Sequence, residues 1–143
     1  MTPTLLGRWQ TRILLLFTVG LLVTIPFSIG ILGEPSSNYI GILVWIALFG
    51  IGWDILYDRI QKFRWDRDWP ASFQLLAGIW EAIFILFVLN GLGIQLPGIE
   101  ELPISLGTFI FHYSTVWLTV FTASQTMMRV VFPRWRFRGG KWL

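Results

Sequence analysis

The chain contains no cysteine and only one histidine. The lack of cysteine excludes disulfide bonds, thiolate nucleophiles, iron–sulfur clusters and covalently attached c-type haem. A single histidine also excludes haem ligation by two histidines. No P-loop, HExxH, dinucleotide-binding or nucleophile motif occurs in the sequence. We therefore expect a protein that is not an enzyme and that holds no metal through a cluster of side chains.

Charged residues are scarce as well. They make up 13% of the 143 residues, whereas a soluble domain carries about 25%. Hydrophobic residues account for 55%, and the mean hydropathy is +0.65. Because so little polar surface is available for water, we expect lipid to be the solvent. The net charge of +3 is then explained by membrane topology, and nucleic acid is not an expected partner.

What the sequence does contain is four long apolar stretches. They cover residues 13–32, 39–57, 71–92 and 102–128. A helix needs roughly 20 apolar residues to cross the hydrocarbon core of a bilayer. The pattern predicts an all-α membrane protein, with one transmembrane domain of residues 1–143 folded as an up-down bundle of four transmembrane helices.

The eleven Lys and Arg residues indicate how this bundle is oriented. They occur before the first stretch, between the second and third, and at or beyond the end of the fourth. The other two connections carry Glu34, Glu100 and Glu101 and no basic residue. The positive-inside rule therefore predicts that the N and C termini are both cytoplasmic. Anionic lipid headgroups are the expected partners on that side.

Two features of the first stretch concern helix packing. Gly20, Thr24 and Ser28 recur at a spacing of four residues. Small residues at this spacing let a second helix approach closely. Pro26 lies within the same stretch and is expected to kink the helix.

Glu81 is the most informative single residue, because it lies near the middle of the third apolar stretch. A carboxylate at that depth costs at least ~2.5 kcal/mol. His112 lies about ten residues into the fourth stretch, so at roughly 1.5 Å per residue both groups fall near the midplane. We predict that Glu81 and His112 form a mid-membrane polar pair. The pair has either a structural role, with a protonated glutamic acid bonded to the neighbouring helix, or a functional one.

The fourth stretch carries a polar stripe with alternating spacings of three and four residues. Its members are Ser105, Thr108, His112, Thr115, Thr119, Thr122, Thr126 and Arg129. On a helix they lie within an arc of about 120°, so we expect this face to turn away from lipid. Three roles remain open: packing against another helix, a proton or ion path, or a bound pigment. His112 could supply one axial ligand to chlorophyll or haem.

A second group of residues is predicted at the cytoplasmic interface, in contact with lipid or a partner. It comprises Asp54, Asp58, Arg64, Trp65, Asp68, Trp69, Arg134, Trp135, Arg136 and Arg138. Asp54 and Asp58 form either a solvated helix face or a pair of catalytic carboxylates. The basic and aromatic tail, residues 133–143, either sets the topology as an anchor or grips anionic lipid or an acidic partner.

The second helix is expected to continue beyond the membrane as far as Pro70. Three opposite-charge pairs at i,i+4 favour this extension: Asp58–Lys62, Lys62–Asp66 and Arg64–Asp68. Trp65 and Trp69 would then share a helix face.

Four segments carry a resemblance to a known family. They are residues 53–57 (Trp-Asp-Ile-Leu-Tyr), 64–70 (Arg-Trp-Asp-Arg-Asp-Trp-Pro), 78–81 (Gly-Ile-Trp-Glu) and 132–140 (Phe-Pro-Arg-Trp-Arg-Phe-Arg-Gly-Gly). The chain resembles a family of small cyanobacterial integral membrane proteins that has no assigned activity. The resemblance implies a thylakoid or plasma membrane and a link to photosynthetic complexes, their assembly or the cell envelope. It implies no catalytic residue.

The leading hypothesis is a non-enzymatic accessory subunit, assembly factor or scaffold of a membrane complex. It would act through contacts with other membrane proteins or with copies of itself. One alternative is pigment or haem binding through His112. Another is a small oligomeric transporter or channel that uses Glu81 and the polar stripe. A third is an enzyme acting on lipid through Asp54 and Asp58.

Overall fold

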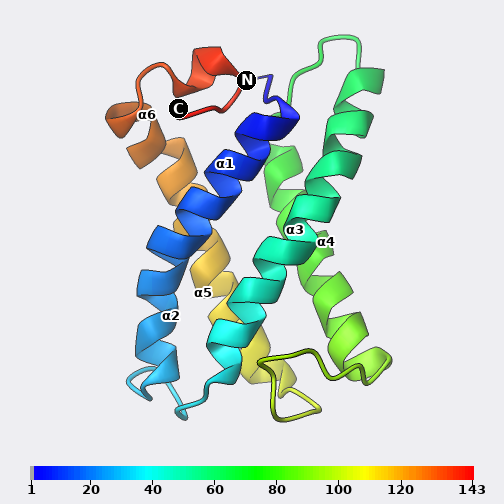
Figure 1. Cartoon of the computed structure of the whole chain (residues 1–143), viewed down its shortest axis with the longest axis vertical. Helices are drawn as coiled ribbons and strands as arrows, with labels where there is room; N and C mark the ends of the chain where they lie inside the picture. Colours follow the sequence, from blue (N-terminus) through cyan, green and yellow to red (C-terminus); the bar gives the residue numbers. More distant parts are fainter. Residues whose placement is uncertain (1) are drawn as a thin grey trace.

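The computed structural model describes residues 2–143 and is built from four helical rods (Figure 1). The first rod consists of α1 (Leu5–Leu15), a π-helical turn (Leu16–Gly20) and α2 (Leu21–Ser28). The second rod is α3 (Asn38–Phe63). No strand occurs among residues 2–143, so the prediction of an all-α fold is confirmed.

The remaining rods complete the bundle. The third is α4 (Ala71–Leu86), which a π-helical turn (Phe87–Gly91) extends. The fourth is α5 (Leu106–Gln125), followed by the short α6 (Met127–Val131) and a 3-10 turn (Trp135–Arg138). Successive rods run in opposite directions, and both termini lie at the same end of the bundle (Figure 1).

Three of the rods are long and apolar enough to cross a membrane: Leu5–Ser28, Asn38–Phe63 and Ala71–Gly91. The chain is therefore consistent with a multi-pass integral membrane protein. α5 has 20 residues but is not among these three helices. Its threonines, serines and single histidine dilute the apolar content that the other rods have.

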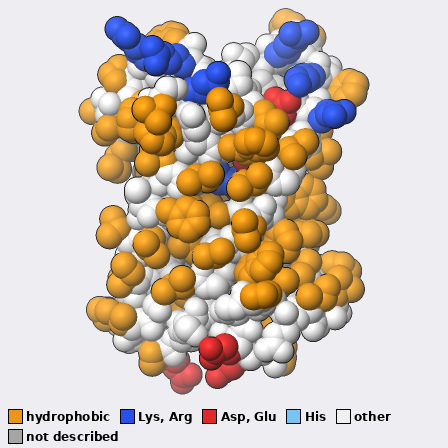
Figure 2. Space-filling view, in the orientation of Figure 1, with side chains coloured by type: hydrophobic (Ala, Val, Ile, Leu, Met, Phe, Trp, Pro, Cys, Tyr) orange, Lys and Arg blue, Asp and Glu red, His pale blue; other side chains and the backbone are white. Residues whose placement is uncertain are grey.

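The basic and acidic residues separate along the bundle axis. Lys and Arg side chains gather at the end that holds both termini, and an acidic group marks the opposite end (Figure 2). The opposite end carries the connection with Glu34 and the connection with Glu100 and Glu101. The charge pattern predicted from the sequence is therefore present in the folded chain.

The first helix begins earlier than predicted. It begins at Leu5 rather than near residue 13, because the Thr4 hydroxyl accepts a hydrogen bond from the Gly7 amide (3.2 Å) and caps the helix. Arg8 and Arg12, which we expected to precede the membrane span, therefore lie within the first rod. The earlier start of the helix therefore places basic side chains inside the bundle.

The second helix ends earlier than predicted. It ends at Phe63 instead of continuing to Pro70, because Arg64 adopts an extended backbone. The Asp58–Lys62 pair is confirmed (2.7 Å), but the helical pairs predicted beyond it are wrong, and Arg64 bonds Asp66 instead (2.9 Å).

The same early end separates the two tryptophans that were expected to share a face. Trp65 is 95% exposed. Trp69 instead packs against Tyr57, with ring centroids 5.5 Å apart. Trp65 remains a candidate for lipid or partner contact, whereas Trp69 is part of the bundle.

The half of the bundle farther from the termini, which we call the outer half, is closely packed. Leu43, Leu89 and Phe109 are at most 1% exposed. The predicted ridge of small residues lies here: a side chain on Gly20 would reach Leu43 and Val116 at 3.3 and 3.6 Å. The close approach predicted for this ridge is thus confirmed at Gly20.

Candidate functional site

An arginine lies between two carboxylates in the half of the bundle nearer the termini, the inner half. Arg12 donates from Nε and Nη2 to Asp54 Oδ2 (2.8 Å) and Oδ1 (2.9 Å). It also donates from Nη1 and Nη2 to Glu81 Oε2 (2.8 Å) and Oε1 (2.9 Å). Both pairs are bidentate, the geometry that the planar guanidinium favours. We call Arg12, Asp54, Glu81 and Tyr57 the ionic cluster.

The ionic cluster joins three rods. Arg12 comes from α1, Asp54 and Tyr57 from α3, and Glu81 from α4. The Tyr57 hydroxyl donates to Glu81 Oε1 (3.2 Å). The side chains of Asp54 and Glu81 are only 5% and 6% exposed. The cluster therefore fixes the relative positions of the three helices in the inner half.

A glycine provides the room for the arginine. A side chain on Gly50 would collide with the guanidinium of Arg12. Gly50 precedes Asp54 by one helical turn, and Tyr57 follows Asp54 by three residues, so all three lie on one face of α3. Sequence reasoning missed Arg12, Gly50 and Tyr57. The common face of Gly50, Asp54 and Tyr57 within the apolar α3 is a signal that could have revealed Gly50 and Tyr57.

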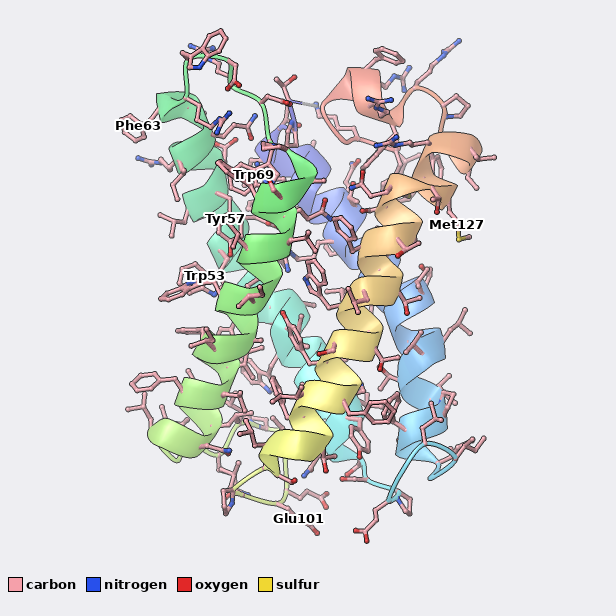
Figure 3. The ribbon with its side chains drawn as sticks, turned by 180° about the vertical axis from the view of Figure 1, so that it is seen from behind. Trp53, Tyr57, Phe63, Trp69, Glu101 and Met127 are labelled. Carbon is pink, nitrogen blue, oxygen red and sulfur yellow. The ribbon has the colours of Figure 1, made fainter. Side chains whose placement is uncertain are left out.

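A cleft of about 290 Å³ adjoins the ionic cluster, between α1, α4 and α5. Arg12, Asp54, Tyr57 and Glu81 line its floor, and mainly apolar residues line its walls: Leu15, Leu16, Ala77, Gly78, Val116, Trp117 and Val120. Figure 3 views the molecule from the side of α4 and α5, with α1 behind them and Tyr57 close to Trp69. The lining extends to exposed Arg129 and Arg136, so the cleft opens at the basic end.

The mouth of the cleft is polar. Arg8 donates from Nη2 to Gln61 Oε1 (2.6 Å) and lies 4.4 Å above the ring of Trp69. Its Nε is buried and has no hydrogen-bond partner among residues 2–143. Arg129 donates from Nη2 to Gln125 Oε1 (2.9 Å). Gln125 in turn donates to Gln74 on α4 (3.2 Å), which links the two helices across the mouth.

The C-terminal tail folds back onto α1. Thr4 N donates to Gly139 O (2.7 Å), and Thr11 Oγ1 donates to Gly140 O (2.8 Å). Trp135, predicted to contact lipid or a partner, is only 5% exposed and donates from Nε1 to Thr11 Oγ1 (2.8 Å). That prediction is wrong for Trp135 because the indole packs inside the fold.

The basic side chains of the tail remain at the surface. Arg134, Arg136 and Arg138 are all exposed, and only Arg136 of the three lines the cleft. The tail thus places one arginine at the mouth and leaves two outside it. Their predicted contacts with lipid or a partner stay predictions.

Asp54 and Asp58 do not form the interfacial pair considered from the sequence. Asp54 is 3% exposed and bound to Arg12, whereas Asp58 bonds Lys62 (2.7 Å). The prediction of a surface position is wrong for Asp54, because the early start of α1 brings Arg12 opposite it. Each aspartate has its own basic partner, so the two are not directed at one substrate.

The predicted pairing of Glu81 with His112 does not form. Glu81 bonds Arg12 and Tyr57, while His112 Nε2 lies 3.1 Å from Thr24 Oγ1. Arg12 and Thr24 are twelve positions apart along the first rod, so the two sites are separated by roughly 18 Å. The prediction failed because it placed both groups at one depth. α5 begins at Leu106, about a turn later than predicted, which puts His112 in the outer half.

His112 is enclosed by aromatic rings. Its ring centroid lies 5.0 Å from that of Phe27 and 4.9 Å from that of Tyr39, and the side chain is fully buried. A chlorophyll or haem ligated by His112 would have to displace these rings. The packing gives no support to the predicted pigment site.

The polar stripe of α5 faces outward, with the exception of His112. Four of its hydroxyls donate to the carbonyl of the residue four positions earlier, at 2.7–2.8 Å: Thr115, Thr119, Thr122 and Thr126. Ser105, Thr108 and Arg129 are exposed. The stripe is therefore not a packing face within the chain, because a different face of α5 carries Phe109, Tyr113 and Val116 inward. Packing against another protein stays a prediction.

No family model, curated protein or solved structure matches this chain. The resemblance to a cyanobacterial family stays a prediction. The ionic cluster and the cleft are therefore interpreted from their own geometry and chemistry.

Proposed function

We propose that the protein is a non-enzymatic integral membrane protein that binds a small amphipathic molecule in the cleft at its basic end. Four helices cross the bilayer in this proposal, and both termini are cytoplasmic. The observation that supports it best is a cleft of about 290 Å³ with apolar walls and an ionic floor. Ligand sites in proteins are typically concave and apolar, with a few polar groups placed at fixed positions.

The surface of α5 is compatible with a fourth crossing. The hydroxyls of its polar stripe are satisfied by the helix's own carbonyls, as with Thr115 and Thr119. These groups therefore lose little when lipid replaces water around them. The gathering of basic residues at one end favours the cytoplasmic placement of that end.

The buried charges favour a binding role over a purely structural one. Burying an ion pair costs free energy that its own attraction often fails to recover, so such a pair is weak support for stability alone. Ionisable residues at membrane depth usually mark functional sites. Arg12, Asp54 and Glu81 are held by mutual hydrogen bonds, so the floor of the cleft is organised before a ligand arrives.

The outer half argues against a conducting path in a single chain. Phe27, Leu43, Leu89 and Phe109 are at most 1% exposed and lie between the cleft and the opposite end. The cleft therefore has no continuation to the opposite end in this conformation. Binding and delivery to a partner fit this shape better than transport, and they are compatible with the accessory or assembly role expected from the sequence.

Native mass spectrometry of protein extracted in mild detergent tests the proposal. Wild-type protein should retain one or more small-molecule adducts, and Ala77→Trp should lose them because the indole fills the cleft. Leu76→Trp is the matched control, since Leu76 adjoins it on α4 but is 62% exposed. The two variants should be equally monodisperse.

A second pair of variants guards against misfolding of Ala77→Trp. Val120 lines the same cleft from α5, whereas Leu118 is 54% exposed. Val120→Trp should abolish the adducts and Leu118→Trp should keep them. Wild-type protein without any adduct, or adducts that survive both cleft substitutions, would refute the proposal.

A further inference from the structure

We infer that the ligand of the cleft is an anionic phospholipid from the leaflet at the basic end, with its phosphate held by Arg8, Arg129 and Arg136. This inference rests on the proposed function and names the chemistry of its ligand. All three guanidinium groups line the cleft. Together they form a cationic rim around its mouth.

None of the three rim arginines forms a salt bridge within residues 2–143, although Asp54 and Asp58 attract Arg8 from a greater distance. Arg12, Lys62 and Arg64 each lie in a salt bridge with a carboxylate. Across residues 2–143, no carboxylate lies within 4.0 Å of the side-chain nitrogens of Arg8, Arg129 or Arg136. Arg8 and Arg129 are held instead by the neutral amides of Gln61 and Gln125. The rim therefore has the charge and the free donors that an anion requires.

Arg8 provides an independent indication of a missing acceptor. Its Nε is buried without a hydrogen-bond partner in the described chain. A buried donor without an acceptor is costly. Its guanidinium is fixed by Gln61 and by the ring of Trp69, so the unmatched donor stays at the cleft. A phosphate oxygen would satisfy it with a charge-assisted hydrogen bond.

The floor of the cleft is less suited to an anion than the mouth. Arg12 uses four of its five N–H groups on Asp54 and Glu81. The two carboxylates give the ionic cluster a formal charge of −1 when both are ionised. An anionic group would be repelled there and attracted at the rim, one turn of α1 nearer to the cytoplasm.

The walls of the cleft favour a lipid over a soluble phosphate compound. Leu15, Val116, Trp117 and Val120 give the ligand apolar contacts below the rim. Trp69 and Trp135 also line the cleft, and indoles favour the headgroup level of a bilayer. A lipid at that level would place its phosphate at the cationic rim. Its hydrocarbon chains would lie below, against the apolar walls of the cleft.

Competition between two lipids tests the inference. Delipidated protein in detergent is incubated with equal amounts of phosphatidylglycerol and phosphatidylcholine of the same chain length, and native mass spectrometry measures the ratio bound. Wild-type protein should prefer phosphatidylglycerol. Arg129→Gln/Arg136→Gln should reduce this preference about tenfold or more, since each basic group near an anionic lipid contributes substantially.

Two other arginines provide a control with the same change in net charge. Arg134 and Arg138 are exposed in the same segment and do not line the cleft. Arg134→Gln/Arg138→Gln should keep the wild-type lipid preference. An equal loss of preference in both double variants would overturn the inference, because it would indicate general attraction rather than a site.

Three further outcomes show which of the two proposals fails. Equal binding of the two lipids by wild-type protein, abolished by Ala77→Trp, would overturn the inference and leave the proposed function intact. Displacement of phosphatidylglycerol by millimolar inorganic phosphate would overturn the choice of a lipid as ligand. Failure of both lipids to bind, with adducts unaffected by Ala77→Trp, would refute both.

Discussion

The inner and outer halves of the bundle bury polar groups in two different ways. In the inner half, Arg12 carries a full charge that Asp54 and Glu81 share through four hydrogen bonds. In the outer half, Thr24 is the one hydrogen-bond partner of His112 among residues 2–143, with its hydroxyl 3.1 Å from Nε2. The inner half has a cleft of about 290 Å³ beside its polar groups, whereas aromatic rings enclose His112.

Glycines contribute to this difference. Gly50 leaves space for the guanidinium of Arg12, and Gly20 leaves space for Leu43 and Val116. A glycine thus makes room for a charged group in the inner half and for apolar side chains in the outer half. The comparison shows that one helical bundle can carry a cleft beside buried charges at one end and a closely packed core at the other.

The largest effect is expected at Arg12. Arg12→Leu leaves Asp54 and Glu81 buried without a counter-charge, so the free energy of unfolding should fall by about 3–5 kcal/mol. Unfolding in mixed detergent, followed by circular dichroism, measures it. Arg12→Lys should lose less, because it keeps the charge but not the bidentate geometry. Wild-type stability in Arg12→Leu would show that the ionic cluster does not hold the inner half together.

The next effect should arise at Gly50. Gly50→Ala places a methyl group against the guanidinium of Arg12, so we expect a loss of about 1–3 kcal/mol and weaker ligand retention. Gly52→Ala is the matched control, since nothing lies within 4 Å of its added methyl group. That control should be neutral or more stable by up to about 1 kcal/mol. Equal effects at the two positions would contradict the steric role of Gly50.

A smaller effect is expected in the outer half. Thr24→Val removes the hydrogen-bond partner of His112 Nε2, and such bonds between membrane helices contribute about 0.6 kcal/mol on average. The same unfolding assay should therefore show a loss well below that of Arg12→Leu, with ligand retention unchanged. A loss of ligand in Thr24→Val would mean that the two halves are coupled.

The smallest effect is expected in the connection between α3 and α4. The hydrogen bond from Arg64 lowers the pKa of Asp66 below its ordinary value of 3.8. Because the folded-state pKa is lowered, the stabilisation is fully present above pH 3.8 and is lost as the pH falls through the lower folded value. Asp66→Asn should remove this acid dependence and leave ligand binding unchanged. NMR titration of the Asp66 carboxyl carbon measures the shift.

The helical architecture follows from the sequence because long apolar stretches require helices. The positions of the basic residues predict which helix ends lie at the same end of the bundle. The ends of the helices were less predictable. The cap at Thr4 and the extended backbone at Arg64 depend on single residues that hydropathy does not weigh. The positions of these helix ends determine whether Arg12 is predicted at the surface or in the interior.

The site was only partly predictable for the same reason. Glu81 was correctly identified as a buried ionisable residue. Which residue pairs with it depends on the depth of each side chain in the bundle, and that depth depends on where each helix begins and ends. The contact of Gly139 with Thr4 joins parts of the chain that are far apart in sequence. No spacing rule connects them, so the folding of the tail onto α1 became visible only in the structure.

The folding of the tail onto α1 has a consequence for biosynthesis. The tail is translated after all four rods, yet it supplies Arg136 to the rim and Trp135 to the packing around Thr11. A nascent chain can therefore insert its helices while the entrance to the cleft is still unfinished. If the cleft binds a lipid as we infer, the complete rim would be available to it only after the ribosome has synthesised this segment.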